Sequence, residues 1–335
     1  MRTLKHKIFI KNNLSSVSFL FCFLLFSSCS GFKNSQHAIH LDKSYCNKQK
    51  QTIYTQADLP KPLYELDIDT VLKNRFSNTS LNMANAIGIL DILTDYTKLL
   101  LDSSHSSSLE KRIAILEHIH QIDQKINFTS LEISAIASEL DCEEERTNQF
   151  ASYLKERESQ TEKGLVIGSI IVGAAGAIAA EVVAKKSSND NLVTGFTIGT
   201  SLVETSLGVL MLVNKRKIDF KHSDNALTDI WNNSTVSSYF PPSIWYYLTY
   251  ENPNTKEKSL AKLLVEKWFL FGQVEEESSN PKDNNNKLYF GNGGQYGADE
   301  LDNRADMLDQ TESYVTLMKQ DLKTLMAEIA KLDKK

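Results

Sequence analysis

The most informative absence in this chain of 335 residues is that of catalytic and nucleotide-binding motifs. It contains no GxSxG nucleophile turn, no HExxH zinc motif, no P-loop and no GxGxxG dinucleotide fingerprint. His118 and His120 are two residues apart on a predicted helix, so they face different directions and we do not expect them to bind one metal ion. We therefore predict that the protein is not an enzyme, with no catalytic residues, no metal site and no cofactor.

Long hydrophobic runs are also few, and the first of them lies near the start of the chain. Four basic residues precede a short apolar run, Leu14–Phe26, and two serines separate this run from Cys29. The run is too short and too rich in serine for a good membrane-spanning helix. A basic start, a short apolar core and small residues are typical of a secretory signal peptide, so we expect the chain to leave the cytoplasm.

The end of this leader, Phe26-Ser27-Ser28-Cys29, resembles a bacterial lipobox, although the residue three before the cysteine is usually aliphatic. The resemblance implies cleavage after residue 28 and attachment of palmitate and other lipid at Cys29. Ser30 would then fit sorting to the outer membrane, with the protein facing the periplasm. An ordinary cleaved signal peptide, with Cys29 incidental, is the alternative.

The chain has no excess of positive charge. The leader holds four basic residues and no acidic ones, so 37 − 4 leaves 33 basic residues against 42 acidic residues in the mature chain. A protein that binds a polyanion needs a basic face to replace its counterions. Nucleic acid is therefore excluded as an expected partner.

Cysteine is scarce, with four residues in the whole chain. Cys22 leaves with the leader and Cys29 is assigned to lipid, which leaves Cys46 and Cys142. In an oxidising compartment two thiols most simply form a disulfide, which here would tie the N-terminal segment to the helical body. Two unpaired buried cysteines are the alternative.

Proline and glycine are rare outside two stretches, and apolar residues recur at helical spacing, so the fold class predicted is all-α. We expect a bundle of long amphipathic helices with a glycine-rich apolar helical hairpin. Helical periodicity runs from about Leu63 to Leu101, and again through Ile115, Ile119, Ile122 and Ile126. Asn127 and Phe128 then interrupt the pattern, and a capping box at 129–132 predicts a new helix start.

The composition changes abruptly at residue 164. Residues 164–184 and 192–213 are two apolar arms with one charge each, Glu181 and Glu204, joined by a short polar link. Glycine inside a helix costs about 1 kcal/mol relative to alanine, so its clustering here indicates close packing of helix backbones. We therefore predict a tightly packed antiparallel hairpin over 164–213. Its glycines are Gly164, Gly168, Gly173, Gly176, Gly195, Gly199 and Gly208.

The hairpin has two possible locations. Each arm is long enough to cross the apolar layer of a membrane, about 30 Å thick. The two carboxylates favour a protein interior or a water-lined site instead. The positions of Lys185-Lys186 and of 215–217 also disagree with the rule that basic residues stay on the cytoplasmic side. The arms could therefore be buried in the chain's own core, in a homo-oligomer or in a target membrane.

The rest of the chain divides by composition. Residues 214–274 are rich in aromatic side chains, which we interpret mainly as core, with a ligand-stacking surface as the alternative. Residues 275–298 read as a flexible loop. In 299–335 apolar residues recur every seven positions, which predicts a coiled-coil seam against the chain's own helices or another copy. The expected segments are the signal peptide 1–28, the tether 29–62, amphipathic helices 63–163, the hairpin 164–213, the aromatic region 214–274, the loop 275–298 and the helix 299–335.

Two functions fit this organisation. The first is a non-enzymatic envelope lipoprotein that acts as a structural or assembly module, with a protein partner or a second copy. The second comes from a resemblance: amphipathic helices, a Gly-rich apolar hairpin and further helices, over about 80–270, are similar to the layout of α-helical pore-forming proteins. That resemblance implies a hairpin that inserts into a membrane as an oligomer. We prefer the first function.

Overall fold

The computed structural model of the chain describes residues 46, 53–102, 108–186, 215–222, 224–275 and 285–332, with the side chains of 166–186 and 285 left out. Over these residues the protein is all-α, as predicted, and the described strands form one small antiparallel sheet. The elements are η1 (Gln56–Asp58), η2 (Leu63–Glu65), α3 (Thr70–Lys73), α4 (Asn78–Ala86), α5 (Leu90–Leu101), α6 (Leu109–Lys186), β1 (Ile218–Lys221), α8 (Ala226–Trp231), α9 (Pro242–Thr249), α10 (Leu260–Leu270), α11 (Asn285–Phe290), β2 (Gly293–Tyr296) and α12 (Ala298–Leu332).

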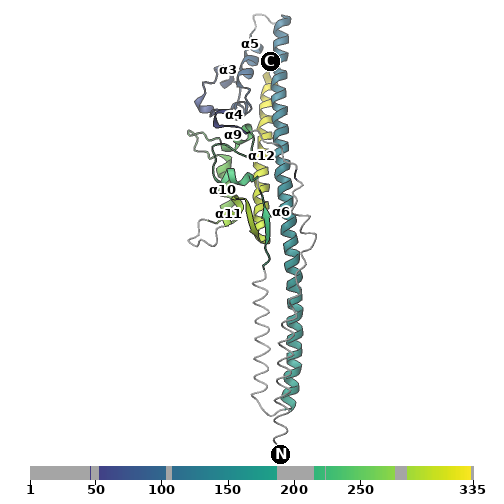
Figure 1. Ribbon diagram of the computed structural model, residues 1–335. Coiled ribbons are helices and arrows are strands. Elements are labelled where there is room, and N and C mark those ends of the chain that lie inside the picture. The colour runs from purple at the N-terminus through teal and green to yellow at the C-terminus, as the bar shows by residue number, and fades with distance from the viewer. Residues whose placement is uncertain are drawn as a thin grey trace, which may run out of the picture. The chain divides into compact units, whose positions relative to one another are not determined.

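The two longest described helices, α6 and α12, pack side by side and antiparallel (Figure 1). Lys155 of α6 forms an ion pair with Asp302 near the start of α12, while Lys319 donates to Ser134 Oγ at 2.8 Å nearer its end. The C-terminal heptad pattern is therefore satisfied within one chain, and the helix predicted there is confirmed. Its buried residues include Leu301, Leu308, Val315, Met318, Leu322, Leu325 and Ile329.

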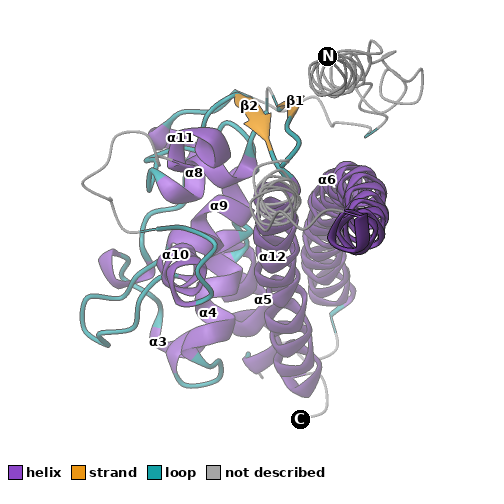
Figure 2. Cartoon of the chain, turned by 90° about the horizontal axis from the view of Figure 1, so that it is seen from below, coloured by secondary structure: helices purple, strands orange, loops and turns teal. Residues whose placement is uncertain are grey.

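Helices α4, α8, α9 and α10 lie on the side of α12 that faces away from α6, whereas α5 packs on α6 (Figure 2). Helices α4, α8, α9 and α10 all contact α12, so α12 is covered on two sides. The aromatic region supplies much of this core, which agrees with its interpretation as packing; Phe271, 62% exposed, is an exception. Buried aromatic residues here are Tyr239, Phe240, Trp245, Tyr246, Trp268, Tyr289 and Phe290.

Single residues account for the start of α9 and for both ends of α10. Pro242 is the first residue of α9, where its missing N–H costs no hydrogen bond. Ser259 caps α10 by accepting from the Lys262 backbone N–H, and the chain turns at Gly272, whose φ is +67°. A positive φ is accessible to glycine at little cost, so Gly272 allows the chain to turn away at the end of α10.

The predicted break at Asn127 and Phe128 is wrong, because α6 continues through both residues. The capping-box residue Thr129 is 3% exposed inside the helix rather than at a helix start. The reason is tertiary packing. Buried positions on α6 continue at spacings of four and three across the proposed break, so the body-facing row is uninterrupted. They are Ile122, Ile126, Thr129, Ile133, Ile136 and Leu140.

Two further expectations need correction. The helical stretch from Leu63 to Leu101 is divided, and Gly88, with φ +70°, lies between α4 and α5. The loop expected over 275–298 contains α11 and β2 in its described part. Strand β2 pairs antiparallel with β1, with Phe220 opposite Gly294. Glycine is required nearby for close approach, because a Cβ at Gly293 would lie 2.1 Å from the Phe220 carbonyl oxygen.

Replacing Gly293 by alanine tests this sheet. The residue has φ +95° as well as the clash, so we expect Gly293→Ala to lower the free energy of unfolding by about 2 kcal/mol or more. Gly164→Ala is the matched control, because no atom of the described residues lies within 4 Å of a Cβ there, and we expect a change between zero and a gain of about 1 kcal/mol. Urea titrations followed by circular dichroism measure both; equal effects would contradict this account of β2.

Candidate functional site

The base of the predicted hairpin is where α6 leaves the body and the chain returns. The backbone N–H of Arg216 donates to the Glu158 carboxylate at 2.8 Å. The Arg216 guanidinium also donates to Thr161 Oγ1 at 3.0 Å. Arg216 is thus held beside Glu158 and Thr161, although 54 residues lie between Thr161 and Arg216. We call Glu158, Thr161 and 215–217, with the acidic residues they meet on α12, the hairpin base.

Ion pairs reinforce the hairpin base. Lys215 pairs with Asp299 at 2.8 Å, and Lys217 with Glu300 at 3.7 Å. The Lys215–Asp299 hydrogen bond raises the pKa of Lys215 and lowers that of Asp299. Pairs as exposed as these contribute about 1 kcal/mol at most. They therefore position the returning chain and mark a charged boundary next to the apolar arms.

The first arm of the hairpin is helical and continuous with α6 as far as Lys186. Past Thr161 this helix runs for 25 residues, or about 37 Å at 1.5 Å per residue. Because α12 starts at Ala298, beside the hairpin base, this part of α6 continues beyond that start (Figure 1). In the part of the chain with described side chains, no helix is long and apolar enough to cross a membrane.

The predicted site residues of the hairpin are described unevenly. Gly164 lies in α6, and none of the described residues has an atom within 4 Å of its Cβ position. The others on the first arm lie on the helix, but their surroundings are outside the described side chains: Gly168, Gly173, Gly176 and Glu181. Gly195, Gly199, Glu204 and Gly208 lie outside the described residues, as do the leader and Cys29. The packing of the two arms and the lipidation of Cys29 remain predictions.

The structure joins Cys46 to Cys142 by a disulfide, with the two Cα atoms 5.7 Å apart. This is the pair that the cysteine content of the mature chain favoured. Tyr54 adds a second attachment: its hydroxyl donates to the Phe240 carbonyl at 3.0 Å and accepts from the Ser237 N–H at 3.1 Å. The N-terminal segment is thus held to α6 and to the helical layer on the other side of α12.

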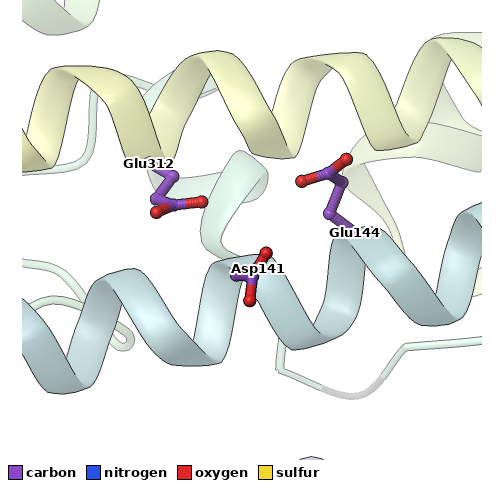
Figure 3. Close-up of side chains that lie close together, drawn as sticks. All are labelled: Asp141, Glu144 and Glu312. Atoms are coloured by element: carbon purple, nitrogen blue, oxygen red, sulfur yellow. The ribbon is translucent and has the colours of Figure 1, made fainter.

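An acidic cluster lies between the two long helices. Asp141 and Glu144 of α6 and Glu312 of α12 point into the same space, with carboxylate oxygens within 4.8 Å of one another (Figure 3). Burial, followed by the charges of Asp309, Asp141 and Glu312, raises the pKa of Glu144. Oxygen ligands suit Ca²⁺, which takes about six to eight of them, so three carboxylates could supply part of such a set. Carboxylates alone do not assign a metal.

Sequence reasoning missed a buried polar network beside the sheet. Arg304 is fully buried and donates to Asn225 Oδ1 and to the Tyr289 carbonyl at 3.0–3.2 Å. Burial, helped by nearby Arg304 and Arg146, lowers the pKa of His222 to about 2, and its Nε2 lies 2.9 Å from the Tyr296 hydroxyl. These groups join β1 and β2 to α12, a structural role. No sequence motif identifies them, because their partners are scattered along the chain.

No protein family, curated protein or solved structure matches this chain. What the fold defines is therefore a class: an all-α protein built on a long antiparallel helix pair, with a charged base from which an apolar arm continues.

The disulfide allows a direct test. It closes a loop of 96 residues in the unfolded chain, so we expect Cys142→Ser to lower the free energy of unfolding by about 2–4 kcal/mol. Reducing agent should produce the same loss in the wild-type protein and no further loss in the variant. A variant as stable as the oxidised wild type would show that Tyr54 and its neighbours hold the segment without the disulfide.

Proposed function

We propose that the protein is a non-enzymatic helical module of the cell envelope, anchored through Cys29, that assembles by pairing the outer face of α6 with α6 of a second copy. The outer face is a set of large apolar side chains that are 47–71% exposed. It consists of Leu109, Ile113, Leu116, Phe128 and Leu131. This face carries the proposal; the leader that resembles a lipobox supports the location.

The outer face lies opposite the face that packs on the body. Ile113 and Leu131 are each nine residues from the fully buried Ile122, which is about two and a half helical turns. Helix α6 is therefore apolar on two opposite sides, and the body uses one of them. A surface helix of a monomer normally carries charged and polar residues on the side away from the core.

The size and spacing of this face suit a second copy. Burying five such side chains from each of two copies removes on the order of 1,000 Å² from water, near the lower limit for a specific interface. A two-fold interface presents the same patch twice and needs no other partner. His120 and Gln124 lie in the middle of the face and hydrogen-bond each other at 3.0 Å. They interrupt the apolar residues of the face without adding an ion pair.

A charge on the outer face tests the assembly. We expect Leu131→Glu to weaken self-association at least about tenfold, because the carboxylate would have to be buried without a partner. Sedimentation equilibrium of the full mature chain measures the dissociation constant. Met326→Glu is the control, since Met326 is 46% exposed on α12 and lies away from this face. A wild-type chain that sediments as a monomer at all concentrations would overturn the proposal.

A second candidate function, membrane insertion of the hairpin, is favoured by the hairpin base. The described residues on either side of the hairpin meet at a charged level, because Arg216 binds Glu158, and the apolar sequence begins one residue after Lys163. A sharp change from charged to apolar residues at one level suits the surface of a bilayer. Oligomers of such a hairpin would account for its glycine spacing.

Fractionation of an unlipidated variant separates the two functions. Cys29→Ala with a cleavable signal peptide is exported without lipid, and its membranes are then washed with alkaline carbonate. Retention in the pellet would make the hairpin a membrane anchor; we expect release, since two arms with one carboxylate each insert weakly. Adding Ile171→Glu in the first arm is the control: it should convert a retained protein into a released one only if lipid contacts hold it.

A further inference from the structure

A polar groove lies on the side of α12 away from α6. It is bounded by η2 and α4, by the end of α9 with the loop that follows, and by Asp321 of α12, and has a volume of 800 Å³. A second hollow of 470 Å³ lies on the other side of the loop and shares Asn252, Glu257 and Lys258 with the groove. Volumes of about 300–1,000 Å³ are typical of ligand sites.

One wall of the groove carries an amide whose orientation is set by its neighbours. Buried Asn85 donates from Nδ2 to the Tyr246 hydroxyl at 2.9 Å and to the Lys61 carbonyl at 2.8 Å. The Tyr246 hydroxyl then donates to Asn82 Oδ1 at 2.8 Å. Asn82 therefore presents its Nδ2, which has no acceptor among the described residues, as a donor in the lining of the groove.

A hydrogen-bond acceptor is held in place nearby. The Tyr247 hydroxyl donates to Asp321 Oδ2 at 2.9 Å, and burial raises the pKa of Tyr247, so this donor stays protonated. Asp321 Oδ1 has no donor among the described residues and remains an acceptor. A positioned donor and a positioned acceptor thus line the same groove, each supported by a tyrosine hydroxyl in contact with it.

Aromatic surface completes the groove. Tyr64 is 46% exposed, and Tyr250 packs against Tyr246 with ring centroids 5.4 Å apart. Neither the Tyr64 nor the Tyr250 hydroxyl has a hydrogen-bond partner among the described residues. The charged lining residues are balanced in sign: Lys73 and Lys258 against Glu257 and Asp321. A ligand with a large net charge would therefore gain little here.

We propose that this groove binds a neutral oligosaccharide. Sugar hydroxyls can both accept from an amide and donate to a carboxylate, and Asn82 and Asp321 present these two groups in one groove. The C–H face of a sugar ring packs on an aromatic side chain, and Tyr64 and Tyr250 offer such surface. The second hollow across the loop extends the surface to more than one sugar ring. This inference is independent of the assembly proposed for α6.

Titration calorimetry of the full mature chain tests the site with three probes: a tetramer of N-acetylglucosamine, a tetramer of glucose and an uncharged tetrapeptide. We expect saturable binding of at least one sugar probe. Tyr64→Ala should weaken that binding about tenfold, as the loss of one stacking surface predicts. Asp321→Asn should weaken it by a similar factor while preserving the shape of the side chain.

Two control variants carry equivalent changes outside the groove. Phe271→Ala removes an exposed aromatic ring from the end of α10, and Asp306→Asn changes an exposed carboxylate on α12. Both should bind within twofold of the wild type. The proposal is overturned if neither sugar binds, if only the tetrapeptide binds, or if Tyr64→Ala and Asp321→Asn bind the sugar as tightly as their controls.

Discussion

The packing of α12 against α6 is the constraint on which the rest of the protein depends. Helix α12 is buried on one side by α6 and on the other by the short helices, so its apolar rows must serve both. Registration between the helices is fixed at separated points, by Lys155 with Asp302 and by Lys319 with Ser134. This registration brings Asp299 and Glu300 to the level where the chain returns at 215–217, and therefore sets where the body ends and the apolar arm begins.

The same registration also brings acidic residues of the two helices together and leaves one side of α6 uncovered. Acidic residues from both helices meet at Asp141, Glu144 and Glu312, and their repulsion is tolerated because the apolar rows on either side hold the helices together. Helices α12 and α5 both pack on α6, and the exposed apolar residues of α6 lie opposite its buried row, where they can form an interface. Assembly and groove are thus placed on opposite sides of one helix pair, and a bound partner on one need not cover the other.

Sequence reasoning succeeded where the signal was local or periodic. The heptads of 299–332 predicted the C-terminal helix, and the aromatic residues clustered in 214–274 predicted a packed core. It failed where residues that are distant in the sequence determine the local structure. The capping box at 129–132 is a valid local signal, but the buried row of α6 overrides it. Gly293 looked like loop because nothing local reveals that the Phe220 carbonyl approaches it. The groove joins residues from 63 to 321, and no window of sequence contains it.

The disulfide has a mechanical meaning. Cys46 follows Cys29 by only 17 positions, and an extended chain of that length reaches about 60 Å. A load applied at the first of these cysteines would enter the fold at Cys142, far from either end of α6, rather than at a terminus. A lipid at Cys29 would therefore transmit force to the middle of α6 through the disulfide.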